Sequence, residues 1–325
     1  MTALSVIIPA KDVAPYIGDT LASLVRNDRP DFEYIVIDDG SADDTPNIVD
    51  DFRRRLPNLR MLRNPAPTGL SSVRNQGVAD SSGRYITYLD GDDWFAPGYL
   101  PTVVEAADRL GVDFAKTDHV QVNGGQRSVH LVPEGRVNRA LDPREGILPA
   151  TTASMVNYPF TSAGIYHRRL VEAGLMDFDP ALHTCEDQPW AWRLHLRADS
   201  FARIPVLGLF YRRGLTGSLT QVGDTRQLHF LNAFRTILDD VLADHEAERY
   251  LPKAVRTFCA ILLNQAEKAD RLSPQDRREM FARGRELLTS LPAQHILEAT
   301  IREMGGKRER RLRKILAGSS RPLAV

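Results

Sequence analysis

The sequence has little cysteine and no net charge. Its 325 residues include only Cys185 and Cys259, which match no metal-ligand spacing and no disulfide framework, so a reducing compartment is expected. Basic and acidic residues number 42 each, so no overall field favours nucleic acid. No apolar run reaches the length of a signal peptide or a membrane span. We therefore expect a cytoplasmic protein that binds no nucleic acid.

Two nucleotide-binding motifs are also missing. The first strand-like run leads into Pro9-Ala10-Lys11-Asp12 and not into a dinucleotide fingerprint of three spaced glycines, and there is no Walker loop. If the protein binds a nucleotide diphosphate, a metal ion and basic side chains would therefore have to hold the phosphates. Arg74, Arg212 and Arg213 are available for that role.

Apolar periodicity alternates between strand and helix over the first hundred residues. Strands are expected at 4–8, 33–37, 59–62 and 85–89, and helices at 15–27, from 45, at 70–78 and from 97. This alternation predicts βαβ units and a parallel sheet that becomes mixed after about residue 118. Long helical periodicity follows from residue 224. We expect a Rossmann-like α/β domain at 1–222 and a smaller all-α domain at 223–325, for acceptor docking or homo-oligomerisation.

Carboxylates follow two of the expected strands. Asp38 and Asp39 come after one strand, and Asp90-Gly91-Asp92-Asp93 after another, where ligands bind in open α/β sheets. A hard cation such as Mg²⁺ or Mn²⁺ takes a few carboxylate oxygens and fills its octahedron with phosphate and water. Asp90 and Asp92 meet that demand, and Gly91 allows a tight turn between them. The alternative is that these acids only cap helices or form turns.

Four motifs occur in order along the chain: Ser5–Pro9, Val36–Ser41, Gly69 with Arg74–Asn75, and Tyr88–Asp93. Together they resemble glycosyltransferase family 2, which has the GT-A fold, over residues 4 to about 220. The resemblance implies an inverting, metal-dependent hexosyltransferase. Its donor would be a nucleotide-diphosphate sugar, with UDP favoured. Its acceptor would be a hydroxyl of a surface glycan, a wall polymer or a glycosylated natural product.

The same resemblance implies roles for individual residues. Asp92 would be the principal ligand of Mn²⁺ or Mg²⁺, with Asp90 as second ligand nearer the ribose. Asp39 would accept a hydrogen bond from the base, and which of two adjacent arginines binds the diphosphate is left open. The full set expected to bind the donor is Pro9, Lys11, Asp39, Arg74, Asn75, Asp90, Gly91, Arg212, Arg213 and Ser218.

The catalytic base is expected farther along the chain. An attacking hydroxyl must lose its proton, which a carboxylate can accept. The resemblance places this role on Asp187, with Glu186 contacting sugar hydroxyls. The alternative is that both acids only cap the helix that carries Trp190.

Two other functions and one surface remain open. A nucleotidyltransferase that makes the activated sugar would need a basic glycine-rich loop after the first strand, and a non-catalytic scaffold would use its helical tail for assembly. Residues 302–314 carry five more basic than acidic side chains. This run is either a solvated terminal helix or a peripheral contact with the inner face of an anionic membrane.

Overall fold

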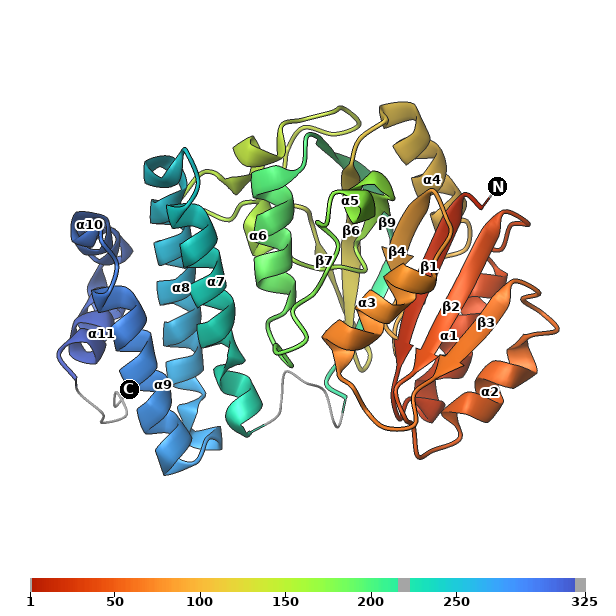
Figure 1. Cartoon of the computed structure of the whole chain (residues 1–325), viewed down its shortest axis with the longest axis horizontal. Coiled ribbons are helices and arrows are strands. Elements are labelled where there is room, and N and C mark those ends of the chain that lie inside the picture. Colours follow the sequence, from red (N-terminus) through yellow and green to blue (C-terminus); the bar gives the residue numbers. More distant parts are fainter. Residues whose placement is uncertain (1, 216–222, 319–325) are drawn as a thin grey trace. The chain divides into compact units, whose positions relative to one another are not determined.

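The computed structural model describes residues 2–215 and 223–318, and its central feature is a mixed sheet (Figure 1). Within the described residues the strand order is β3-β2-β1-β4-β8-β6-β9-β5, and β7 pairs with β6. The strands are β1 (Leu4–Ala10), β2 (Phe32–Asp38), β3 (Leu59–Arg63), β4 (Tyr85–Tyr88), β5 (Trp94–Phe95), β6 (Phe114–Asn123), β7 (Gln126–His130), β8 (Gly164–His167) and β9 (Phe201–Arg213). The four strands expected in the first hundred residues are therefore confirmed.

Parallel and antiparallel pairing divide the sheet. β1 pairs in parallel with β2 and β4, and β2 with β3, whereas β8 runs antiparallel to β4 and β6. The hairpin between β6 and β7 turns at Gly124. The prediction of a parallel sheet that becomes mixed is confirmed.

Helices connect the parallel strands by crossovers. They are α1 (Ala14–Val25), α2 (Thr45–Phe52), α3 (Leu70–Asp80) and α4 (Tyr99–Leu110). The chain moves outward from β1 to β3 and then returns to β4, so right-handed crossovers place α3 on the opposite face from α1 and α2 (Figure 1). The fourth helix begins two residues later than expected, because Gly98 has a φ of +74°.

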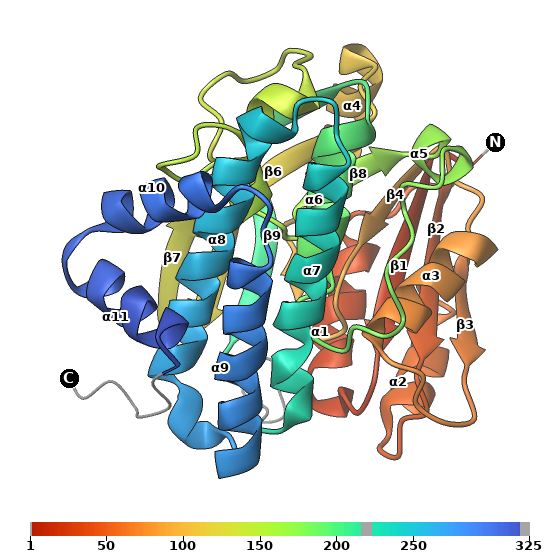
Figure 2. The same ribbon diagram turned by 60° about the vertical axis from the view of Figure 1, so that its left-hand side comes forward.

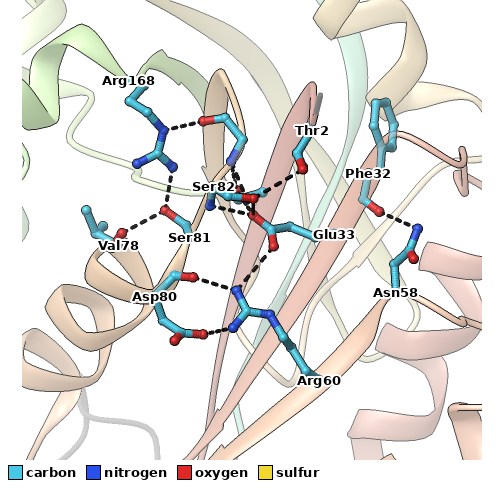
Figure 3. Close-up of polar contacts among 12 residues, drawn as sticks. Thr2, Phe32, Glu33, Asn58, Arg60, Val78, Asp80, Ser81, Ser82 and Arg168 are labelled. Atoms are coloured by element: carbon cyan, nitrogen blue, oxygen red, sulfur yellow. Dashed lines mark hydrogen bonds and ion pairs between the residues drawn. The ribbon is translucent and has the colours of Figure 1, made fainter.

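A half-buried glutamate, Glu33, ties the starting ends of three strands together (Figure 3). Glu33 Oε1 accepts hydrogen bonds from Ser5 Oγ at 2.6 Å, Ser82 N at 2.6 Å and Gly83 N at 3.2 Å. Arg60 donates to Glu33 Oε2 at 3.2 Å. A Cβ at Gly83 would lie 2.5 Å from Ser5 N, so glycine is needed for this close approach. The network fixes the register of β1, β2 and β4, and so also the place where each strand ends.

The chain divides into two compact units. The first contains residues 2–145, 158–181 and 194–215, and the second contains residues 146–157, 182–193 and 223–318. The expected boundary near residue 222 falls in 216–222, outside the described residues, and stays a prediction. The helical character expected after residue 224 is confirmed.

The second unit is built mainly from helices. α7, α8 and α9 run side by side (Figure 2). Its helices are α7 (His229–Leu242), α8 (Ala247–Glu267), α9 (Pro274–Thr289), α10 (Gln294–Met304), α11 (Gly306–Leu316) and the first part of α6 (Asp187–Arg197). Lys253 on α8 is buried and donates from Nζ to Pro149 O at 3.2 Å and Thr152 O at 2.6 Å. Burial lowers the pKa of Lys253 to about 8. This lysine ties the segment 146–157 to α8.

Candidate functional site

The predicted donor residues of the first unit gather where parallel strands end. Ala10 is in register with Asp38, and Ile7 with Tyr88, so Asp39 and Asp90 follow the two strands that flank β1 and lie at one edge of the sheet. Gly91 N donates to Pro9 O at 3.1 Å, which joins the end of β1 to the loop after β4. The strand ends place these residues as the parallel sheet predicted.

Asp39 organises the turn that leads into α3. Its carboxylate accepts hydrogen bonds from Thr68 N at 2.8 Å, Thr68 Oγ1 at 2.9 Å, Gly69 N at 2.9 Å and Asn64 Nδ2 at 2.9 Å. Burial raises the pKa of the Asp39 carboxyl, but these hydrogen bonds outweigh it, and the pKa lies below its ordinary value. Asp39 is therefore charged and serves its own fold. The expected hydrogen bond to a base stays a prediction.

A cavity of about 400 Å³ opens beside this turn. It is lined by Gly40, Ser41, Arg63, Asn64 and Pro65. Arg63 Nε lies 3.0 Å from Asp38 Oδ2. Gly40 has a φ of +69°, and a Cβ there would lie 3.1 Å from Ala66 C, so glycine keeps this wall open. Arg63 and Asn64 were not among the residues predicted from the sequence, although both lie where β3 ends and the rule that ligands bind at strand ends, applied to β3, would have identified them.

The loop after β4 is held from several sides. Thr20 Oγ1 on α1 lies 3.0 Å from Gly91 O and 2.7 Å from Asp93 O. Asp93 N donates to Asp90 O at 3.0 Å, and a Cβ at Gly91 would lie 3.1 Å from Pro9 O. The tight turn expected at Gly91 is present. It brings the carboxylates of Asp90, Asp92 and Asp93 close together.

These carboxylates repel one another. Burial, and then the charge of Asp90, raise the pKa of Asp92 to about 6. Burial and the charges of Asp92 and Asp90 also raise the pKa of Asp93 well above its ordinary value. Asp93 Oδ1 accepts from Arg212 N at 2.7 Å, while Asp93 Oδ2 is buried without a hydrogen-bond partner among the described residues. Such a cluster favours any bound positive charge.

The carboxylates of this loop fit a divalent cation only if oxygen atoms of a bound ligand complete its coordination. Within residues 2–215 and 223–318, no three histidine, cysteine or acidic side chains are arranged to hold a metal ion. Asp92, whose pKa is raised by burial and by the charge of Asp90, would form with Asp90 a suitable partial set for Mg²⁺ or Mn²⁺, which keep phosphate and water oxygens as their other ligands.

Arg74 and Asn75 face different partners. Arg74 is 3% exposed, and its Nη2 lies 3.3 Å from Asp90 Oδ1 while its Cζ lies 5.2 Å from the centre of the Phe178 ring. Asn75 exchanges two hydrogen bonds of 2.8 Å with the backbone of Phe178. Arg74 therefore orients a predicted metal ligand, and Asn75 anchors the chain at residue 178.

The basic residues of the predicted donor site contact different partners. Lys11 pairs with Asp12 at 2.5 Å, and both side chains are 44% exposed. Arg212 Nε donates to Asp92 O at 2.8 Å, and Arg213 Nη1 donates to Tyr211 Oη at 3.1 Å. Ser218, the last expected donor residue, lies outside the described residues.

Glu186 and Asp187 belong to the second unit. Asp187 is the first residue of α6, and Glu186 directly before it is 7% exposed. The preceding Cys185 has a φ of +63°, a conformation that costs energy for any residue with a side chain. Burial, and then the charges of Asp187 and Glu186, raise the pKa of the Cys185 thiol. This cysteine is therefore a neutral neighbour of the acid pair.

Sequence comparison identifies relatives for much of the chain. The family described as Glycosyl transferase family 2 matches residues 5–171. The glycosyltransferase EpsJ of Bacillus subtilis is 28% identical over 224 residues, which cover 67% of this chain and 63% of EpsJ. The succinoglycan biosynthesis protein ExoO of Rhizobium meliloti is 29% identical over 292 residues, covering 78% of this chain and 80% of ExoO.

The poly(ribitol-phosphate) beta-N-acetylglucosaminyltransferase TarS of Staphylococcus aureus is 25% identical over 245 residues, covering 74% of this chain and 41% of TarS. The aligned regions thus span less than two thirds of both EpsJ and TarS.

Solved structures of S. aureus TarS share the fold. TarS 1–349 in complex with UDP has a TM-score of 0.74 and 20% identity, covering 98% of this chain and 88% of that one. The complex of TarS 1–349 with UDP-GlcNAc has a TM-score of 0.69 and 20% identity, covering 97% and 91%. The GT-A fold, a mixed Rossmann-like sheet followed by helices, is therefore confirmed.

Proposed function

The chain belongs to glycosyltransferase family 2, and from this membership we propose that it moves a sugar from a nucleotide-diphosphate donor to an acceptor hydroxyl. The observation that carries the proposal is the loop of residues 90–93, where three acidic residues follow β4 at the strand ends of the α/β sheet, and where burial and their charges raise the pKa values of Asp92 and Asp93. UDP is the proposed nucleotide, in line with the UDP and UDP-GlcNAc complexes of TarS. A wall polymer or other surface glycan is the proposed acceptor, in line with the names of TarS and ExoO.

The base of the donor is proposed to enter the 400 Å³ cavity. Asn64 lines it and offers an amide, and Gly40 leaves room for close backbone approach. Asp39 already accepts several hydrogen bonds from its own chain, so it acts on the base mainly by holding Asn64 and the turn at Thr68. Pro9 and Gly91 stand between this cavity and the acid cluster because they join β1 to the loop.

Asp92 and Asp90 are proposed to hold Mn²⁺ or Mg²⁺ together with the diphosphate. The ion would neutralise negative charge on the leaving nucleoside diphosphate. The raised pKa values of Asp92 and Asp93 support this assignment, because a cluster of buried acids gains most from a bound cation. Arg74 keeps Asp90 oriented by its contact of 3.3 Å.

Inversion by a single displacement is also part of the proposal. The acceptor hydroxyl would attack the anomeric carbon as the bond to the diphosphate breaks, and Asp187 would take the hydroxyl proton. Glu186 would contact sugar hydroxyls. The placement of Asp187 at the first turn of α6 supports its role, because a helix N-terminus favours the charged carboxylate that a base requires.

The proposal is tested by incubating the chain with UDP-sugars and Mn²⁺ and measuring free UDP and the anomeric configuration of the product. Release of UDP together with a product of inverted anomeric configuration supports the proposal. Release of pyrophosphate would identify a nucleotidyltransferase instead, and absence of turnover with every nucleotide-sugar would favour a scaffold. Asp92→Asn serves as the matched inactive variant, because it removes one charge with no change in side-chain size.

A peripheral membrane contact is proposed for α11. In the described residues no helix is long and apolar enough to cross a membrane. Arg311 pairs with Glu267, and Arg313 with Glu298 at 3.2 Å. Further cations of α11 are exposed and have no acidic partner among the described residues, namely Lys307, Arg308, Arg310 and Lys314. Co-sedimentation of the protein with anionic but not with neutral vesicles would support the membrane contact. Homo-oligomerisation is a separate proposal, which sedimentation of the protein at several concentrations tests.

A further inference from the structure

Strand alternation separates the two arginines at the end of β9. Successive side chains of a strand point to opposite faces, so the side chains of Arg212 and Arg213 leave β9 on opposite faces. Arg212 lies on the face of Trp94, with its Cζ 4.7 Å from the ring centre. Arg213 lies over Tyr211, at 5.5 Å, and Tyr211 faces Phe160 at 5.9 Å between ring centres. The two arginines therefore have different environments and need different roles.

Arg212 makes polar contacts with the acid loop and with α1. Its backbone N donates to Asp93 Oδ1 at 2.7 Å, and its Nε donates to Asp92 O at 2.8 Å. Its Nη2 lies 3.3 Å from Asp19 Oδ2 on α1. These contacts join β9, the loop of residues 90–93 and α1 through one residue.

Aromatic rings hold the Arg212 guanidinium on two sides. Its Cζ lies 4.9 Å from the centre of the Tyr16 ring and 4.7 Å from that of Trp94. Trp94 in turn stacks on Phe210, with ring planes 1° apart. The Arg212 side chain is only 22% exposed. A planar cation held between rings and hydrogen-bonded at its edge has little freedom to turn toward a ligand.

We propose that Arg212 is a positioning residue that holds the loop carrying Asp90 and Asp92, and that Arg213 is the arginine that contacts the donor's diphosphate. The inference rests on the proposed function for the identity of the ligand. Arg213 has a hydrogen bond to the Tyr211 hydroxyl and no carboxylate partner among the described residues. Its charge is therefore available for charge-assisted hydrogen bonds to phosphate oxygens. We call Arg212 with these contacts the clamp. The backbone carbonyl of Asp92 accepts a hydrogen bond from Arg212, so Asp92 would lose its fixed orientation without the clamp.

Asp19→Asn separates the two roles of Arg212 by the sign of its effect. Asp19 is 71% exposed and contacts the clamp from α1, so its replacement should leave the fold intact. If Arg212 is a clamp, Asp19→Asn frees part of it and weakens UDP binding in the presence of Mn²⁺ by about twofold to fivefold. If Arg212 binds the diphosphate, removal of a competing carboxylate leaves UDP affinity unchanged or higher, and the proposal is wrong. The readout is the Kd of UDP from titration calorimetry.

A double-mutant cycle tests the coupling directly. Arg212→Met should weaken Mn²⁺-dependent UDP binding by about tenfold, because it removes a charged donor from the Asp92 carbonyl. Asp19→Asn should add nothing to Arg212→Met if both act through one clamp. Independent, multiplying losses would overturn the clamp. Arg212→Lys keeps the charge but not the planar fork, so its loss should fall between those of wild type and Arg212→Met.

Arg213→Met tests the second half of the proposal. It should weaken UDP binding by about tenfold or more and leave uridine binding unchanged, because only UDP carries the diphosphate. Unchanged UDP affinity would overturn the assignment of Arg213. The matched control is Arg29→Met at the other end of the sheet, where an arginine also pairs with an acid, Asp31, and lies 5.1 Å from the ring centre of Phe32. It should change neither Kd.

Failure of the clamp and failure of the proposed function give different results. A wild-type chain that binds no nucleoside diphosphate contradicts the proposed function. The clamp is then tested without ligand, by urea unfolding of the same cycle. Coupling between Asp19 and Arg212 in the free energy of unfolding supports the clamp, and strict additivity overturns it.

Discussion

Replacing Asp39 by asparagine should destabilise the protein as well as weaken donor binding. The carboxylate accepts hydrogen bonds from two backbone N–H groups, those of Thr68 and Gly69, and from Asn64 Nδ2. Hydrogen bonds to a charged group contribute about 1.5–3 kcal/mol each. Asparagine keeps one acceptor oxygen and turns an amide NH₂ toward at least one of these donors. We therefore expect a loss of about 2–4 kcal/mol in the free energy of unfolding.

The direction in which this loss of stability changes with pH follows from the pKa of Asp39. Because the pKa of Asp39 lies below its ordinary value, its contribution is complete above the pKa of the unfolded chain, near 4. It is lost as the pH falls through the lower pKa of the folded state. The difference in unfolding free energy between wild type and Asp39→Asn should therefore be constant from pH 7 to 5 and shrink toward pH 3. Urea unfolding at each pH measures it.

The control for this prediction is Asp50→Asn on α2. Asp50 is 54% exposed and pairs with Arg53 at 2.8 Å, so its replacement should change stability by less than about 0.5 kcal/mol. The reasoning would be refuted by an Asp39→Asn variant as stable as wild type that only binds UDP more weakly. Such a result would mean that Asp39 serves the base and not the turn.

Three further predictions concern the catalytic base, a buried lysine and the sheet. Asp187→Asn should lower turnover by at least about a hundredfold and keep the Kd of UDP, whereas Glu186→Gln should lower turnover less. Near-normal turnover of Asp187→Asn would exclude Asp187 as the catalytic base. Burial lowers the pKa of Lys253 to about 8. From there to about pH 10.5 the unfolded chain holds a proton that the folded chain lacks, so wild-type stability should rise with pH relative to Lys253→Met, by about 2–3 kcal/mol; parallel pH profiles from urea unfolding would contradict this. In Gly208→Ala the new Cβ would overlap the Tyr99 ring, which should cost about 1–3 kcal/mol in urea unfolding, and unchanged stability would show that the ring moves aside.

Continuous apolar runs made the sheet predictable. β1 is buried along its whole length, and its pattern in the sequence indicated a central parallel strand before any contact was known. The acids after β2 and β4 could be placed because the carboxyl ends of parallel strands in one sheet lie at the same edge, and both strands pair in parallel with β1. Membership of glycosyltransferase family 2, expected from four motifs, is confirmed by the match over residues 5–171.

Side-chain roles were harder to predict, because they depend on contacts between distant parts of the chain. Arg212 and Asp92 are 120 residues apart, and nothing in the sequence joins them. Arg74 has the sequence context of an exposed helical residue, yet it is buried against Asp90 and Phe178. The sequence supplies the charges, whereas only the packed sheet decides which of them pair.

In the proposed function the acid cluster after β4 binds a nucleoside diphosphate through a divalent cation. Thermal unfolding with UDP, GDP, ADP and CDP, each with and without Mn²⁺, for wild type and Asp92→Asn, measures this binding. We expect UDP to raise the melting temperature of wild type most, Mn²⁺ to increase that rise, and Asp92→Asn to lose the increase. Equal stabilisation by UDP with and without Mn²⁺, unchanged in Asp92→Asn, would contradict the account.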